Sequence, residues 1–234
     1  MSIVSEVDYR ATQVATEDCS QLKSELKPGE KIIHFIRHAE GHHNVAGRAD
    51  HEAYKLEEFA DASLSPLGHD QCRAVDLKYA DILKDVPLVA TSVMRRCLQT
   101  ASLCFPSLID NGNTKWMASE ECREQTGEHP CDRRRDTTEA KEGYSYIDFS
   151  EITEEHDPIW PLYGSEKREP DEACVLRGRK FLEWACARPE KELIACTHSA
   201  ILARLIPYLI PQDAEFNKVY YENCELRSYI IRTV

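Results

Sequence analysis

Residues 31–40 of the chain are Lys31-Ile32-Ile33-His34-Phe35-Ile36-Arg37-His38-Ala39-Glu40. The first six form a short, mostly apolar run that is typical of a buried β-strand. This strand ends in Arg37 and His38, a fixed cation and an imidazole. Because open α/β sheets bind ligands at the carboxyl ends of their strands, this junction predicts an anion site and favours phosphate chemistry.

Composition sets limits on the class of protein. The chain has 234 residues, of which 42% are apolar and 30% charged, as in a globular domain. No apolar run approaches the ~20 residues of a membrane helix, so no membrane span is expected. The formal charge of −12 argues against a nucleic-acid partner, which binds a net basic face. The first thirty residues lack the pattern of a secretory signal, and we therefore expect a cytoplasmic protein.

The ten cysteines are scattered, and no two have Cys-x-x-Cys spacing. Structural zinc normally takes its ligands in closely spaced pairs, so this distribution disfavours a zinc site. We expect the cysteines to be mostly reduced, small core residues.

Strands and helices are expected to alternate along the chain. Strands are predicted at 31–36, 87–92, 192–197 and 226–234, with another within 115–124. Helices are predicted at 65–84, 94–105, 171–187 and 199–205. This order predicts an α/β fold, a three-layer α/β/α sandwich around a mainly parallel central sheet. We expect residues 1–29 to be an N-terminal extension and 30–234 a single domain, with an insertion at about 125–170 over the sheet edge.

Four chemical groups follow three of the predicted strands. His38 and Arg37 lie at the end of one, His198 at the end of another, and Arg95 just after a third. Each alone is readily explained as a surface loop residue, but their corresponding positions favour a common site. Two guanidiniums offer forked donors to a tetrahedral dianion, and two imidazoles flank it, an arrangement suited to phosphoryl transfer.

With these residues placed, the chain resembles the histidine phosphatase superfamily, in the branch of the phosphoglycerate mutases. Arg37-His38-Ala39-Glu40 with Asn44 resembles the signature of that family. Four further segments resemble its motifs in the same order: Leu64-Ser65-Pro66-Leu67-Gly68-His69-Asp70-Gln71; Thr91-Ser92 with Arg95 and Gln99-Thr100-Ala101, for the pattern Ser-x-x-x-Arg-x-x-Gln-Thr-Ala; Cys122-Arg123-Glu124 with Gly127; and Thr197-His198-Ser199. The resemblance spans residues 31–205 and implies a phosphoglycerate mutase-like fold.

The resemblance also implies roles for individual residues. His38 would attack phosphorus and become phosphorylated, while Arg37, Arg95 and His198 hold the phosphoryl oxygens. Glu124 would protonate the leaving oxygen and then activate water. The further substrate-binding candidates are Asn44 and Ser199. No metal and no cofactor is implied.

Two features leave alternatives open. Arg133, Arg134 and Arg135 could grip the anionic remainder of a substrate, or form a solvated loop that pairs with nearby carboxylates. His42 and His43 could touch the substrate, but adjacent loop histidines are more often exposed.

The first functional hypothesis is a phosphoric monoester hydrolase, a metal-independent phosphatase whose partner is a small phosphorylated substrate. The alternative is a phosphoglycerate mutase, which must exclude water from its phosphohistidine. The less favoured alternative is a catalytically inactive phosphatase-like scaffold. The insertion at 125–170 is expected to decide the substrate.

Overall fold

The computed structural model describes residues 7–211 and 219–234. Within these residues six strands form one sheet in the order β1-β6-β2-β5-β3-β4. The bounds are β1 Tyr9–Val14, β2 Lys31–Arg37, β3 Leu88–Ser92, β4 Lys115–Ser119, β5 Glu192–Thr197 and β6 Leu226–Thr233. The four strands β2, β5, β3 and β4 run parallel, while β6 and β1 add an antiparallel edge. The predicted α/β sandwich with a mainly parallel sheet is confirmed.

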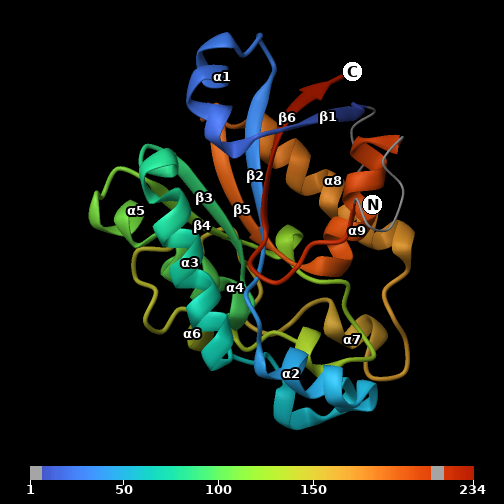
Figure 1. Cartoon of the computed structure of the whole chain (residues 1–234). Helices are drawn as coiled ribbons and strands as arrows, with labels where there is room; N and C mark the ends of the chain where they lie inside the picture. The colour runs from blue at the N-terminus through green and yellow to red at the C-terminus, as the bar shows by residue number, and fades with distance from the viewer. Residues whose placement is uncertain (1–6, 212–218) are drawn as a thin grey trace.

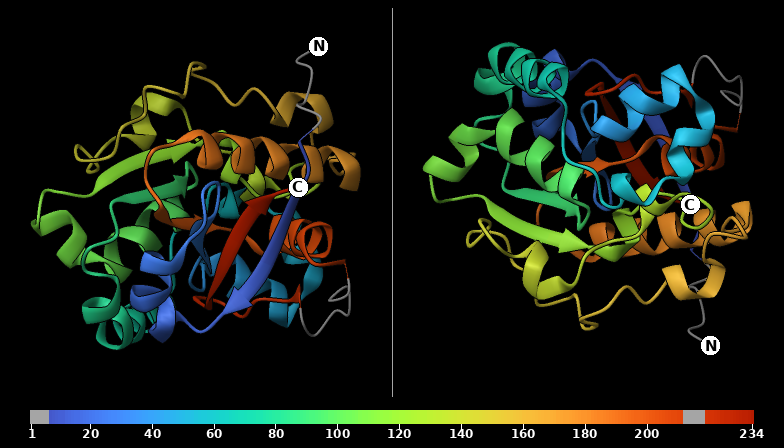
Figure 2. Two further views of the ribbon diagram at one scale, coloured as in Figure 1. Left: turned by 90° about the horizontal axis from the view of Figure 1, so that it is seen from above. Right: turned by 90° about the horizontal axis from the view of Figure 1, so that it is seen from below.

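Helices cover both faces of the sheet (Figures 1 and 2). Their bounds are α1 Cys19–Glu25, α2 His42–Ala49, α3 Pro66–Leu83, α4 Arg95–Cys104, α5 Pro106–Asp110, α6 Thr137–Ala140, α7 Trp160–Tyr163, α8 Asp171–Ala187 and α9 Ser199–Leu209. Apolar residues of α3, α4 and α5 pack on one face of the sheet, and those of α8 and α9 on the other. No described helix is both long and apolar enough to cross a membrane.

The N-terminal segment corrects one boundary. Residues 1–29 were expected to be an extension outside the domain, but β1 pairs with β6 and closes the sheet as an edge strand. Tyr9 and Ala11 point into the core while Thr12 and Gln13 are exposed. A short edge strand with one polar face has a weak sequence signal, because backbone pairing supplies much of its stability.

One predicted boundary also shifts. The helix expected to stop before Pro207 continues to Leu209. Proline removes one helical hydrogen bond, but burial of Ile206 and Leu209 against the sheet offsets that loss. Strand β4 ends at Ser119, whose hydroxyl accepts a hydrogen bond from the Glu121 N–H and begins a short 3-10 turn.

The insertion lies where the site is built. Residues 125–170, all of them described, form short helical turns, among them α6 and α7, joined by irregular chain. Figure 1 shows α2, α6 and α7 at the end of the sheet where β2 terminates. The parallel strands β2, β3 and β5 therefore present their carboxyl ends to the insertion, as the topology of an open α/β sheet predicts for a ligand site.

Candidate active site

A polar pocket of about 240 Å³ opens at the carboxyl end of the sheet. Its lining comes from the end of β2, from α2 and the turn after it, from the first turns of α4 and α9, and from the chain between β4 and α8. The lining residues are Arg37, His38, His43, Asn44, His51, Tyr54, Arg96, Glu124, His129, Cys131, Asp132, Arg168, Ser199 and Ala200. Three guanidiniums face two carboxylates in this set, so the pocket carries net positive charge when its histidines are neutral.

The ring of His38 is fixed by its own backbone. Its Nδ1 lies 2.7 Å from the carbonyl oxygen of Ala39, which can only accept, so Nδ1 carries the proton. The lone pair is then on Nε2. Burial, aided by the guanidiniums of Arg96 and Arg37, holds the pKa of His38 well below its usual value of 6.5. The neutral imidazole is therefore ready to act as a nucleophile.

Residues 38–40, here called the His38 loop, are held by three separate segments. The His38 carbonyl accepts hydrogen bonds from Asn223 Nδ2 at 3.1 Å and from the Cys224 N–H at 3.3 Å. The Ala39 N–H donates to Thr100 Oγ1 at 2.9 Å, and the Glu40 N–H donates to Gln71 Oε1 at 2.8 Å. These bonds fix the position of His38.

His198 lies directly beside His38. Strands β2 and β5 pair in parallel with Arg37 opposite Thr197, and the two rings meet edge to face with centroids 5.1 Å apart. Arg96 Nε donates to Nδ1 of His198, so the ring proton sits on Nε2 and is donated to Ser92 Oγ at 2.9 Å. Both ring nitrogens are thus engaged by protein groups, whereas the resemblance implied that His198 holds phosphoryl oxygens.

The structure corrects the predicted arginine on α4. Arg95 was expected in the site, but its side chain is 38% exposed and pairs with Glu139 outside the pocket. Arg96 is 1% exposed and lines the pocket, where it pairs with Asp132 at 3.0 Å. The signal was present in the sequence, because counting four residues from Ser92 in the pattern Ser-x-x-x-Arg reaches Arg96.

Arg37 and Asn44 lie in the pocket as expected. Arg37 Nη1 donates to the carbonyl of Tyr221 at 2.7 Å, while its buried Nε has no hydrogen-bond partner among the described residues. Asn44 Oδ1 accepts from the Gly41 N–H, which leaves its amide nitrogen as the donor for a ligand. Unpaired buried donors of this kind indicate a site shaped for an anion.

Glu124 reaches the pocket from the loop after β4. Its carboxylate accepts from the backbone N–H groups of Ala200 and Ile201 in the first turn of α9, at 3.0 to 3.1 Å. The side chain lines the pocket together with Ser199, and Glu124 is 9% exposed. Glu124 is therefore a buried pocket residue and not an exposed surface carboxylate.

The three successive arginines lie outside the pocket lining. Arg133 is on the surface and pairs with Glu57, and Arg135 pairs with Asp61. Arg134 is buried among backbone carbonyls and Glu120. Of the two alternatives, pairing with nearby carboxylates is the one observed, and Arg133, Arg134 and Arg135 are corrected as substrate-binding candidates. The local carboxylates and carbonyls satisfy these guanidiniums and hold the insertion together.

A different arginine of the insertion, Arg168, faces the pocket. Arg168 lines the pocket and pairs with Asp132 at 2.9 Å, so that Asp132 bridges Arg168 and Arg96. Residue-level patterns did not single out Arg168, because it stands alone in an irregular stretch. Only the fold brings residue 168 beside residue 132.

Histidines form the outer wall of the pocket. His43 is 3% exposed and faces the pocket, whereas His42 is exposed. His129 stacks on Tyr54 with ring centroids 5.3 Å apart. The buried atoms His43 Nδ1 and His129 Nε2 have no partner among the described residues. The wall therefore offers unpaired polar atoms to a bound molecule.

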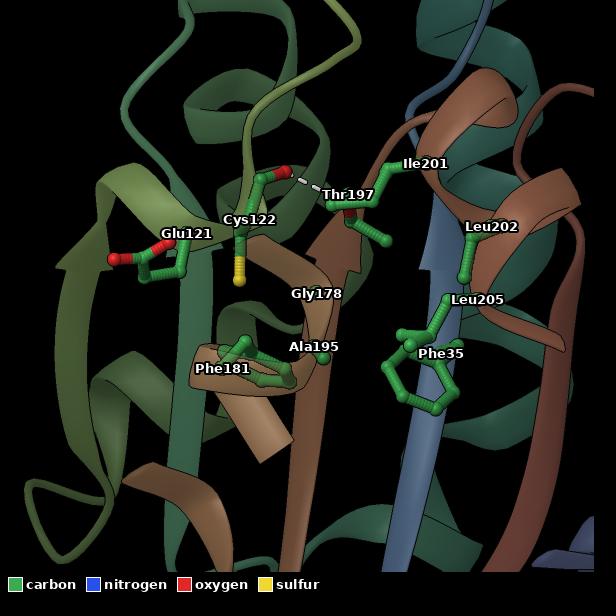
Figure 3. A pocket seen from close by; sticks show the side chains of 10 residues that line it. All are labelled: Phe35, Glu121, Cys122, Gly178, Phe181, Ala195, Thr197, Ile201, Leu202 and Leu205. Carbon is green, nitrogen blue, oxygen red and sulfur yellow. Dashed lines mark hydrogen bonds between the residues drawn. The ribbon is translucent and has the colours of Figure 1, made fainter. Parts of the chain in front are cut away.

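A second cavity lies away from these groups. It sits between the sheet and helices α8 and α9, and its lining is almost entirely apolar (Figure 3). Thr197 Oγ1 donates to the carbonyl of Cys122 at its edge, at 2.7 Å. With a volume of about 10 Å³ it has room for one water. It is a packing void rather than a substrate site.

Comparisons with known proteins agree with this geometry. The model of the histidine phosphatase superfamily (branch 1) matches residues 33–232. Over 231 residues, the chain is 36% identical to a phosphoglycerate mutase-like protein of Arabidopsis thaliana, covering 86% of this chain and 84% of the relative. Phosphoglycerate mutase-like protein 1 of the same plant is 33% identical, covering 86% of this chain and 81% of the relative.

Solved structures share the fold. A mycobacterial glucosyl-3-phosphoglycerate phosphatase superposes with a TM-score of 0.51 at 15% identity, covering 85% of this chain and 89% of the other. A phosphoserine phosphatase from Entamoeba histolytica gives a TM-score of 0.51 at 16% identity, with the same coverage. At these identities the likeness concerns the fold alone.

The buried histidines predict a pH-dependent stability. Burial lowers the pKa values of His38, His43 and His198 well below 6.5 in the folded chain. In the unfolded chain histidine titrates near pH ~6.5, so unfolded molecules bind more protons below that pH. The free energy of unfolding should therefore fall with decreasing pH below about 6.5, by up to about 1.4 kcal/mol per pH unit for each histidine.

Urea unfolding between about pH 5.5 and about pH 7.5, in buffer without phosphate, measures this slope. In a His43→Gln variant, this dependence of the free energy of unfolding on pH should be about one third smaller. A free energy of unfolding that is constant over this range would contradict the assignment of three neutral buried histidines.

Proposed function

The chain belongs to branch 1 of the histidine phosphatase superfamily, and we propose that it is a metal-independent phosphatase of a small phosphomonoester. The observation that carries the proposal is the fixed His38 ring, with its Nδ1–H on the Ala39 carbonyl and its lone pair in a pocket of net positive charge. The reaction would pass through a phosphohistidine on His38.

The first step transfers the phosphoryl group to the enzyme. His38 Nε2 forms a bond to phosphorus as the bond from phosphorus to the ester oxygen breaks. Glu124, in its protonated form, donates its proton to that leaving oxygen. Arg37 and Arg96 stabilise the charge on the equatorial oxygens, where preorganised donors act most strongly.

The second step releases phosphate. Glu124, now a carboxylate, takes a proton from water as the water oxygen bonds to phosphorus and the bond to His38 Nε2 breaks. This cycle restores the neutral imidazole and the protonated acid. His198 contributes through Arg96, which donates to its Nδ1, so we assign His198 as a positioning residue in the state described.

The pocket wall supports a compact anionic substrate. Arg168, Tyr54 and His129 lie beyond the phosphate-binding arginines, and the volume of about 240 Å³ is small for a ligand site. A phosphomonoester with a second polar or anionic group would pair the open nitrogens of His43 and His129. Ser199 and Asn44 add donors near the phosphoryl group.

A phosphoglycerate mutase is the second candidate, since the Arabidopsis relatives carry mutase-like names. The two reactions differ in the fate of the phosphohistidine. With 3-phosphoglycerate as substrate, a phosphatase releases inorganic phosphate in step with substrate loss. A mutase gives 2-phosphoglycerate with little net phosphate, and that result would favour the second candidate.

Removal of the nucleophile tests the mechanism. We expect His38→Ala to lower the rate of p-nitrophenyl phosphate hydrolysis by about 10⁴-fold or more, because the variant cannot form the covalent intermediate. The assay is run with a metal chelator, which should leave the wild-type rate unchanged. Full activity in the variant would refute the mechanism, and a wild-type chain that turns over no phosphate ester would favour the inactive scaffold.

Two adjacent arginines give a matched pair of variants. Arg96→Lys should lower kcat/KM by about 10²-fold or more. The planar guanidinium can hydrogen-bond to Asp132, His198 and a phosphoryl oxygen at once, and the ammonium group of lysine cannot. Arg95→Lys, on the surface, should change kcat/KM by less than about twofold. Equal losses in the two variants would show that Arg96 has no special role.

A further inference from the structure

Three cysteines that are far apart in the sequence meet behind the active site. Cys72 lies on α3, Cys104 at the end of α4, and Cys224 in the loop before β6. Their sulfur atoms all lie within 4.8 Å of one another, and those of Cys104 and Cys224 are 3.6 Å apart. Their exposed fractions are 0%, 0% and 6%, so this thiol cluster is part of the core.

We propose that the thiol cluster of Cys72, Cys104 and Cys224 binds one soft, thiophilic metal ion of the Cu(I) class in a three-coordinate site. The proposal is independent of the phosphatase chemistry, because no reacting atom would touch this ion. The ion would join the three chain segments that hold the His38 loop.

The spacing of the sulfurs fits such an ion. Sulfur ligands stand at ~2.3 Å from a thiolate-bound metal, so three of them around one ion are about 4 Å apart. The cluster already approaches this spacing. Binding would therefore need side-chain rotations rather than a rearrangement of α3 and α4.

The surroundings select the class of metal. Thiolates prefer Cu(I) and zinc among the biological metals, and structural zinc requires a fourth ligand in a tetrahedral site. The described residues place no fourth His, Cys, Asp or Glu ligand atom with the three sulfurs. Because the cluster is buried among apolar side chains, a water ligand is disfavoured too, and a three-coordinate ion fits better.

The backbone conformation of Cys224 also indicates that this cysteine does more than fill space in the core. Its φ is +64°, a left-handed conformation that favours glycine. Cysteine is a common small core residue elsewhere, but here a side chain is kept at a strained position and its sulfur is brought to Cys104.

The link to the active site is direct. Gln71 precedes Cys72, Thr100 lies one helical turn before Cys104, and Asn223 precedes Cys224. These three residues hold the backbone of the His38 loop. An ion bound to the thiol cluster would therefore fix the relative positions of the three segments and stabilise the nucleophile's backbone.

Copper loading tests the proposal. The full chain is refolded with a Cu(I) complex of a competing chelator, freed of excess metal, and analysed for copper by mass spectrometry. We expect one copper per chain in the wild type and a thermal midpoint above that of the metal-free chain, since a ligand that binds only the folded state stabilises it. The copper X-ray absorption spectrum should show three sulfur neighbours.

Variants decide whether the cluster is the site. Cys104→Ala and Cys72→Ala should lose the copper and the thermal shift, while the buried control Cys174→Ala on α8 should keep both. Circular dichroism verifies that each variant is folded, and Cys104→Ser replaces any variant that is not. Any of three results would overturn the proposal. These are equal copper content in the wild type and Cys104→Ala, no copper in the folded wild type, and tight zinc binding in preference to copper.

Discussion

The parallel register of β2 against β5 is the constraint on which the rest of the site depends. It sets Arg37 opposite Thr197, so the residues that follow, His38 and His198, emerge side by side, and the His38 N–H donates to the Thr197 carbonyl at 2.8 Å. A slip of one residue in a strand turns every side chain to the other face of the sheet. Burial of both strands on both faces prevents that slip.

Burial then sets the electrostatics of the pocket. Neutral histidines and charged guanidiniums coexist there because desolvation disfavours a third positive charge beside Arg37 and Arg96. The carboxylate of Asp132 forms ion pairs with the guanidiniums of both Arg96 and Arg168. Loss of one partner of a buried ion pair leaves an uncompensated charge, so Asp132 ties the insertion to the carboxyl end of the sheet.

His38 is connected to the core as well as to the pocket. The three segments that hydrogen-bond the His38 loop come from α3, α4 and the loop before β6, which are distant in sequence. Each also contributes a buried cysteine to one apolar cluster. Packing in this part of the core therefore bears directly on the position of the His38 ring.

The sequence by itself determined five of the six described strands, the strand-end histidines and the family. Apolar runs that end in Arg37-His38 and Thr197-His198 are local patterns, and the parallel topology makes their ends converge. It also identified Glu124 and Asn44 as pocket residues. Periodicity did not reveal β1, because only Tyr9 and Ala11 of that strand are buried and its partner β6 lies at the other end of the chain.

The tertiary structure decided which charges face the pocket. The family pattern counted from Ser92 points to Arg96, but only the packing of α4 shows that Arg96 lines the pocket while Arg95 pairs with Glu139 outside it. The same holds for Arg168, which enters the pocket in place of residues 133–135, and for the cysteines that meet behind it. Contacts between residues far apart in the chain follow from the packing of whole elements, and residue spacing does not encode them.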